Sequence, residues 1–367
     1  MSSVRALERD DLSAVANLLV GAFMSSDRPA GQALVRYLGD LFLDFPDRDP
    51  DIHSLVYVDN DSRVIGFIGA LSQTMAYQGR TLRMAIANSF AVEKRSRDPM
   101  AAPHLLRAFL RGPQDLSLSD RANETSLAMW RTMRGPTLPY YSLDWLRVLH
   151  PTGYAVARLA EHNRLAHALN PIAGGVDQLI ERGSRKSRWT VAPLRSTAGL
   201  MVEDVDDDTL LDVIPGLVAD IALHPVWTEA GLRQVLRDAA HKSTLGTLIR
   251  QVVRDRSGAV VGAYLYHTRP HGIAQTLHVL PARGQTVAVL DCLLADAHAR
   301  GAVAMGGRAQ PGLLEPLMDR RAIFTSRQRC LIGSKDPGIL ATFENGDAVV
   351  TGLVGEYWTR LNGDGLR

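Results

Sequence analysis

The feature that most constrains the fold is a run of fifty residues, 86–135, in which two apolar strands alternate with two helices. It reads IANSFAVEKRSRDPMAAPHLLRAFLRGPQDLSLSDRANETSLAMWRTMRG. The strands are predicted at 86–92 and 114–119, and the helices at 100–111 and from Asp120 and Asn123 onward. A strand that feeds a helix through a tight turn places the first free N–H groups of the helix at the sheet edge, where they can hold a phosphate.

This order and spacing resemble the central motif of the GNAT superfamily of acyl-CoA-dependent N-acetyltransferases. In that family an Arg/Gln-x-x-Gly-x-Gly/Ala turn wraps the pyrophosphate of coenzyme A. Arg97 occupies the position of the family's Arg or Gln, and Leu105-Leu106 match its Leu-Leu pair. Asn123, followed seven residues later by Trp130, is similar to the family's Asn-(six residues)-Tyr helix. The family's glycines are absent from the turn.

The resemblance implies an acyl-CoA co-substrate, acetyl-CoA or another, and no metal. The first strand would lie along the pantetheine arm, the turn would meet the pyrophosphate, and the second helix would complete the site. The residues assigned to the coenzyme are Phe90, Ala91, Val92, Arg97, Asp98, Pro99, Met100, Ala101, Ala102, Asn123 and Trp130.

Two residues of the turn also have simpler interpretations. Asp98 is a favourable helix cap, whereas a carboxylate beside two phosphates costs electrostatic energy. Pro99 suits a first helical turn, and it removes one potential phosphate donor. An apolar core strand at 86–92 and a packed core aromatic at Trp130 are the structural alternatives.

Acyl transfer from a thioester to an amine needs a base for the amine, donors for the oxyanion and an acid for the leaving thiolate. In the GNAT fold a bulge in the central strand supplies a backbone N–H to the thioester carbonyl. Trp130 stands where many members of the family have the acidic Tyr, and indole cannot act as an acid near neutral pH. Tyr140 and Tyr141 are the candidate phenols and Asp120 the candidate base; structural roles for all three are the alternative.

The order of helices and strands in the first half of the chain recurs in the second half. An acidic-capped helix, a hairpin, a strand, a turn and a helix recur from about residue 199, and Arg283-Gly284 resembles a worn copy of the coenzyme turn. A strand is expected at 348–358. We therefore expect an α/β protein of two GNAT-like domains, each with a central, mostly antiparallel sheet flanked by helices. The predicted segments are 1–150 as the acyl-CoA-binding domain, 151–198 as a helical linker with a basic loop at 182–188, and 199–367 as the second domain.

Composition and net charge limit the classes of binding partner that the chain is expected to have. The 367 residues carry a net charge of +2 with no basic stripe, which disfavours a nucleic-acid or membrane-surface binder. No apolar run reaches the roughly 18 residues of a membrane span, and the charged first residues are not followed by an apolar run, so they are not expected to act as a secretory signal. Cys292 and Cys330 are expected to be reduced thiols in the cytoplasm. His267 and His271, separated by a proline, have poor spacing for a metal site.

The predicted function is transfer of an acyl group, most simply acetyl, from coenzyme A to a small amine in a ternary complex. The alternatives are a catalytically silent GNAT-fold protein that binds a ligand or partner, and an acyltransferase with another donor, a longer acyl chain or an aminoacyl-tRNA. The sequence does not identify the acceptor, which could be a sugar amine, an amino acid, a polyamine or a protein lysine. It also leaves the oligomeric state open.

Overall fold

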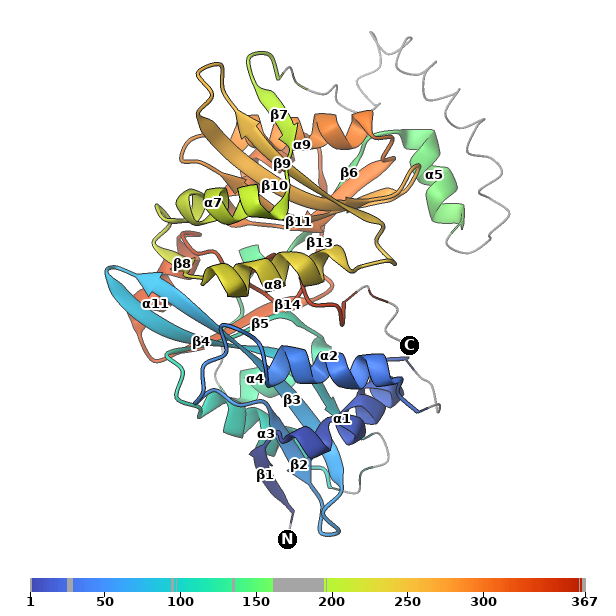
Figure 1. Ribbon diagram of the computed structural model, residues 1–367, viewed down its shortest axis with the longest axis vertical. Coiled ribbons are helices and arrows are strands. Elements are labelled where there is room, and N and C mark those ends of the chain that lie inside the picture. Colours follow the sequence, from blue (N-terminus) through green and yellow to red (C-terminus); the bar gives the residue numbers. More distant parts are fainter. Residues whose placement is uncertain are drawn as a thin grey trace. The chain divides into compact units, whose positions relative to one another are not determined.

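The computed structural model describes residues 2–24, 29–93, 96, 98–133, 136–160, 195, 197–362 and 364 (Figure 1). The chain divides into two compact units. Unit 1 comprises 1–142, 221–238 and 328–367, and unit 2 comprises 143–220 and 239–327. The units are therefore interleaved along the sequence, unlike the consecutive segments 1–150, 151–198 and 199–367 that the sequence predicted.

Unit 1 is built on a sheet that has seven strands among the described residues: six follow the order β1-β2-β3-β4-β5-β14, and the seventh, β8, pairs with β3. All neighbours are antiparallel except β4 and β5, which are parallel. The strands are β1 (Ser3–Ala6), β2 (Leu55–Val58), β3 (Val64–Tyr77), β4 (Arg80–Val92), β5 (Leu116–Ala122), β8 (Leu223–Pro225) and β14 (Arg329–Ser334).

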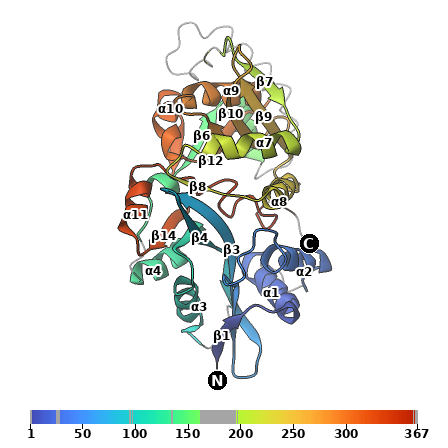
Figure 2. The ribbon, with the colours of Figure 1, turned by 60° about the vertical axis from the view of Figure 1, so that its left-hand side comes forward.

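Helices cover both faces of this sheet. They are α1 (Leu12–Leu19), α2 (Gln32–Phe42), α3 (Ala101–Leu110), α4 (Glu124–Thr132) and α11 (Pro337–Glu344), and α8 (Glu229–Ala240) also begins in this unit. Figure 2 shows α1 and α2 on one side of β3 and β4 and α3 on the other. A core of buried side chains fills the α3 side, where Leu105, Leu106 and Phe109 pack against Ile65, Ile68 and Ala85. The apolar faces of the strands and of α3 thus account for this layer.

Local hydrogen bonds set the ends of these elements. Asn123 accepts a bond from the Ser126 N–H at 2.9 Å and begins α4, as its residue type favours. In the β2–β3 hairpin, the Asp59 carboxylate accepts from the backbone N–H groups of Asp61 and Arg63, each at 2.9 Å. Asp120, predicted as a cap of the same helix, lies instead inside β5 and is 2% exposed. The helix begins later than the sequence suggested because Asn123 is the effective cap.

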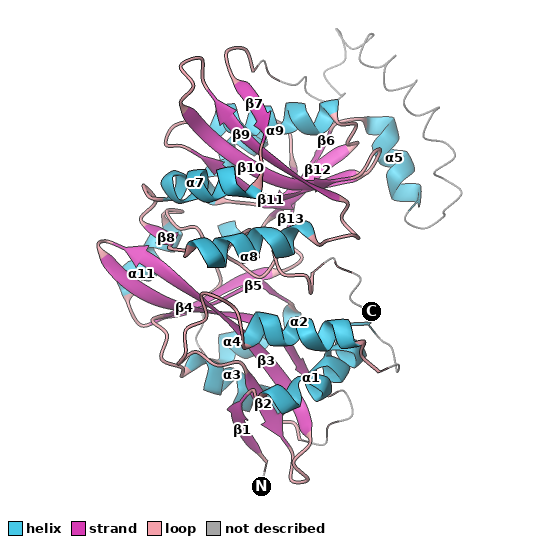
Figure 3. Cartoon of the chain, in the orientation of Figure 1, coloured by secondary structure: helices cyan, strands magenta, loops and turns pink. Residues whose placement is uncertain are grey.

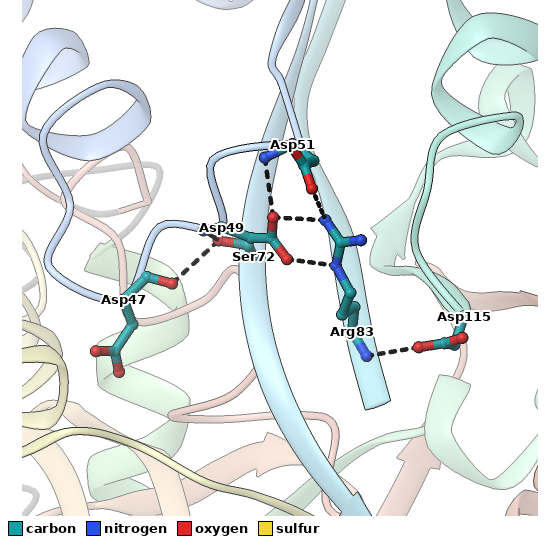
Figure 4. A network of polar contacts seen from close by, with 6 residues as sticks. All are labelled: Asp47, Asp49, Asp51, Ser72, Arg83 and Asp115. Atoms are coloured by element: carbon teal, nitrogen blue, oxygen red, sulfur yellow. Dashed lines mark hydrogen bonds and ion pairs between the residues drawn. The ribbon is translucent and has the colours of Figure 1, made fainter. Parts of the chain in front are cut away.

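A network of carboxylates joins β4 to its neighbours at the end of the sheet where β5 begins (Figure 4). The Arg83 guanidinium donates two bonds to Asp49, at 2.5 and 2.6 Å, and the Arg83 N–H donates to Asp115 at 2.8 Å. The Asp115 N–H donates to the Arg83 carbonyl at 2.9 Å. These reciprocal bonds clamp the beginning of β5 to β4.

Unit 2 repeats the plan with a sheet of the order β13-β6-β12-β11-β10-β9-β7, again of seven strands among the described residues (Figure 3). Its strands are β6 (Asp144–Val148), β7 (Met201–Asp204), β9 (Thr247–Arg254), β10 (Val260–Thr268), β11 (Ile273–Pro281), β12 (Ala304–Arg308) and β13 (Ile323–Thr325). Its helices are α5 (Pro151–Ala160), α7 (Asp207–Val218), α9 (Thr286–Ala299) and α10 (Leu314–Asp319). Both α7 and α9 contact β10 and β11. The predicted two-domain α/β fold, with mostly antiparallel sheets, is confirmed.

The units are interleaved in the sequence because some strands pair in the sheet of the unit that does not directly precede them along the chain. β6 follows α4 in the sequence but pairs with β12 and β13 of unit 2, whereas β14 returns to pair with β5. The strand predicted at 348–358 is wrong, because that segment forms buried turns that include Leu353 and Val354. The basic loop predicted at 182–188 lies outside the described residues.

Candidate active site

The central feature of unit 1 is a gap between β4 and β5. The two strands pair only at Met84–Leu116, Ala85–Ser117 and Ile86–Leu118. Beyond that point β4 continues to Val92 and β5 to Ala122, and the described strands have no further pairing with each other. The backbone edge of β4 that faces the gap is therefore available to another chain-like group, as an unpaired sheet edge is.

A β-bulge in β4 lies beside this gap. On β3, Phe67 pairs with Ala91 and Gly69 pairs with Asn88, so Ser89 and Phe90 together stand opposite a single β3 residue. Ser89 has φ 54°, in the left-handed region that a side chain seldom adopts. A bulge turns the backbone out of the regular ladder, and bulges are frequent next to active sites.

A pocket of about 410 Å³ opens at the gap. Its lining comes from α1 and the π-helical turn after it, from α2, from β3, β4 and β5, from α4, from the residue before β14, and from the segment after α11. The lining residues at the bulge, on β5 and in the C-terminal segment include Ser89, Phe90, Ser119, Arg121, Glu356 and Asn362. All of these residues belong to unit 1, so the pocket is a property of that unit alone.

The polar groups of the pocket are held together by hydrogen bonds. Asn88, beside the bulge, donates from its side-chain amide to the Glu356 carboxylate at 3.3 Å. The Ser89 hydroxyl donates to the Asn88 side-chain oxygen at 2.7 Å. The Glu356 N–H donates to Asp120 at 3.2 Å. These bonds fix the Glu356 carboxylate, whose residue is only 9% exposed, next to the bulge.

Gly355 allows this arrangement. A Cβ at this position would collide with the Asp120 carboxylate, so only glycine lets the segment pass so close to β5. Arg121, which also lines the pocket, donates to the Gln328 side chain at 2.9 Å, and its guanidinium lies 4.8 Å from the centre of the Tyr357 ring. The pocket wall thus includes a carboxylate and a guanidinium, each held by a hydrogen bond to another side chain.

Some of the residues predicted to bind the coenzyme reach this pocket. Phe90, Asn123 and Trp130 line it, and Trp130 is also 1% exposed within the core of unit 1. Ala91 and Val92 do not line it; they pair with Phe67 and Gly66 of β3.

The predicted catalytic side chains do not gather there. Tyr141 is buried and donates its hydroxyl to the Ala348 carbonyl at 3.1 Å, and burial raises its pKa above the ordinary value. Tyr140 is 53% exposed, and neither tyrosine lines the pocket. Asp120 lies next to the pocket as the acceptor for the Glu356 N–H, although the pocket wall itself is formed by its neighbours Ser119 and Arg121.

The predicted pyrophosphate turn contains an internal anion. The Asp98 carboxylate accepts a bond from the Met100 N–H at 2.9 Å and from the Tyr57 hydroxyl at 2.5 Å. The bond from Tyr57 is the main reason that the pKa of Asp98 is lowered, so the carboxylate stays ionised. Pro99 precedes the helix, and Ala101 and Ala102 form its first positions. Arg97 lies outside the described residues.

Unit 2 has a corresponding gap between β11 and β12, and a side chain of the unit itself bonds to the strand edge there. β11 pairs with β12 only from Ile273–Ala304 to Thr276–Gly307, and a register shift beside Leu265 marks a bulge. The Gln310 side chain then accepts from the Val279 N–H at 3.1 Å and donates to the Val279 carbonyl at 2.8 Å. The side-chain amide therefore occupies the backbone edge of β11 that corresponds to the open edge of β4.

Two polar residues of the pocket wall were not found from the sequence. Glu356 and Gln328 reach the pocket from the last forty residues, which the sequence assigned to the second domain. Gly355-Glu356 within an apolar stretch is the only local signal, and it is weak. Within the described residues, no group of His, Cys, Asp and Glu is placed to hold a metal. None of the described helices combines the length and apolarity that a membrane crossing requires.

No known family model and no curated protein matches the sequence. Solved structures do match. A conserved protein of unknown function from Enterococcus faecalis V583, described as a probable N-acyltransferase, has a TM-score of 0.60 and 10% identity over 94% of this chain and 74% of its own. A GCN5-related N-acetyltransferase from Anabaena variabilis has a TM-score of 0.59 and 12% identity, over 90% of this chain and 72% of its own. One from Kribbella flavida has a TM-score of 0.54 and 13% identity, over 90% and 70%. The chain therefore has the GNAT fold along most of its length, as the sequence predicted.

Proposed function

We propose that the chain is an N-acyltransferase that takes an acyl group, most simply acetyl, from an acyl-CoA and transfers it directly to a small amine in the cytoplasm. Unit 1 would bind the donor and unit 2 would serve as a scaffold. The single observation that carries the proposal is the open gap between β4 and β5, with its bulge and its pocket.

A pantetheine arm is the kind of group that such a gap accepts. It is narrow and carries two amides, which can hydrogen-bond to an unpaired strand edge as a neighbouring strand would. The contrast between the units supports this assignment, because the Gln310 amide already satisfies the corresponding edge in unit 2.

The chemistry would take place at the bulge. The amine nitrogen attacks the thioester carbonyl, and a backbone N–H at Ser89 or Phe90 stabilises the oxyanion. Glu356, the carboxylate among the described residues of the pocket wall, accepts the proton that the amine loses. The tetrahedral intermediate then expels the thiolate, and the proton held on Glu356 returns to sulfur. The products are an amide and a free thiol, so atoms and charge balance.

Turnover with defined substrates tests the proposal. The purified chain would be incubated with acetyl-CoA and, in turn, with spermidine, L-lysine, an aminoglycoside and a lysine-containing peptide, and thiol release would be followed by absorbance. We expect release that depends on one class of amine. Acetyl-CoA binding without turnover on any amine would instead favour a catalytically silent binding protein, and the absence of both binding and turnover would refute the proposal.

A further inference from the structure

Among its described residues, the turn that precedes α3 has few backbone donors left for a phosphate. Pro99 and Pro103 have no N–H. The Asp98 N–H donates to the Ser96 hydroxyl at 3.2 Å, and the Met100 N–H donates to the Asp98 carboxylate at 2.9 Å. An anion-binding helix start needs free N–H groups that converge on one point, and here the protein itself has used or removed most of them.

The carboxylate of Asp98 occupies the position that an anion would take. It accepts a hydrogen bond from a backbone N–H at the helix start, as a bound phosphate would, and it accepts a second hydrogen bond from the Tyr57 hydroxyl. Tyr57 is 1% exposed and belongs to the β2 strand, so its hydroxyl is fixed by the core. Two further anions beside this carboxylate would repel it.

The Ala101 N–H is also engaged, with the Asp98 carbonyl at 3.4 Å. Among the described residues 98–103, Ala102 is left as the one backbone donor that is neither absent nor involved in a described bond. A single N–H cannot enclose a diphosphate, whose binding relies on several donors together. The pantetheine gap is open, whereas the described part of the turn beside it offers a single backbone N–H that no described bond uses.

From this contrast we infer that unit 1 recognises its donor as an S-acyl pantetheine, and that the nucleotide diphosphate end of coenzyme A contributes little to binding. The inference rests on the proposed acyltransferase function and makes it more specific. It places recognition in the β4–β5 gap and assigns Asp98, through Tyr57 and Met100, the role of an internal anion that excludes a second one.

Calorimetric titration of the full chain with two probes, coenzyme A and pantetheine, tests the inference. We expect the two dissociation constants to agree within about 5-fold. In Asp98→Ala, which frees the Met100 N–H and removes the negative charge, we expect coenzyme A to bind about 10-fold more tightly and pantetheine to bind as before. Asp98→Asn separates the two effects, because it removes the charge and retains an acceptor for the same N–H.

Asp61→Asn is the matched control, since it removes one negative charge from the exposed β2–β3 turn of the same unit. It should leave both constants unchanged. Coenzyme A binding at least 100-fold more tightly than pantetheine in the natural chain would overturn the inference and leave the acyltransferase proposal intact. Failure of both probes to bind would overturn the proposed function, and the inference with it. Thermal melts of each variant show whether it is folded.

Discussion

The substitution Glu356→Gln tests whether Glu356 is the general base. The substitution conserves the size of the side chain, and the new carboxamide oxygen can still accept the bond that Asn88 donates at 3.3 Å. The backbone N–H of residue 356 donates to Asp120, and this bond does not depend on the side chain at position 356. The variant should therefore fold like the natural chain and lose only the ability to take a proton.

The expected loss is large. A positioned general base contributes about 10²- to 10⁴-fold to a rate. Asp120 lies next to Glu356 and can replace part of its function, so we expect the lower half of that range, about 100- to 1000-fold in kcat, or about 3–4 kcal/mol at the transition state. The KM for the donor should change little, because the carboxylate does not hold the pantetheine arm.

The assay is the initial rate of thiol release from acetyl-CoA with the best amine of the panel, measured between about pH 6.5 and 9.5. The deficit of the variant should shrink as the pH rises, since a growing fraction of the free amine is already deprotonated in solution. A kcat within 3-fold of the natural chain at pH 7, or a deficit that does not depend on pH, would refute the role of Glu356. A melting temperature within about 2 °C of the natural chain serves as the folding control.

Three further predictions concern the β4–β5 gap, the corresponding edge of β11 in unit 2, and the ion pair of Arg83 with Asp49. Ser119→Trp should fill the pocket beside β5, where this side chain is 7% exposed, and weaken acetyl-CoA binding at least 10-fold by calorimetry; unchanged binding would place the donor elsewhere. Gln310→Ala leaves the Val279 N–H and carbonyl without these partners, so it should cost about 1–3 kcal/mol in the free energy of unfolding by denaturant titration, yet leave turnover intact. Asp49→Asn should destabilise unit 1 more at about pH 7 than at about pH 3, because bonds from Arg83 lower the pKa of Asp49 below its unfolded value of about 3.9 and this stabilisation is lost as the pH falls through the folded pKa. Melting curves that stay equally far apart at both pH values would contradict it.

The sequence predicted what depends on local pattern. The apolar runs at 86–92 and 114–119 are strands with a helix between them, and Asn123 begins the next helix, because periodicity and capping act over a few residues. The sequence also singled out the Asp98 carboxylate in the turn, and the structure shows it accepting bonds from Tyr57 and Met100.

The features that the sequence did not predict depend on contacts between residues far apart in the sequence. Glu356 meets Asn88 across more than 250 positions, and no local pattern records that meeting. The exchange of β6 and β14 between the sheets has the same origin, since a strand pattern does not specify its partner. The tyrosines were chosen from their closeness in sequence to the central motif, whereas burial against Ala348 decides the position of Tyr141.

The most direct test of the account is a crystal structure of the chain with acetyl-CoA bound. We predict that the pantetheine arm lies between β4 and β5 of unit 1, with its amides bonded to the β4 backbone and its thioester carbonyl at the Ser89–Phe90 bulge, and that Gln310 remains bonded to Val279. A coenzyme found in unit 2 with Gln310 displaced, or a gap in unit 1 that stays empty at saturating acetyl-CoA, would contradict it.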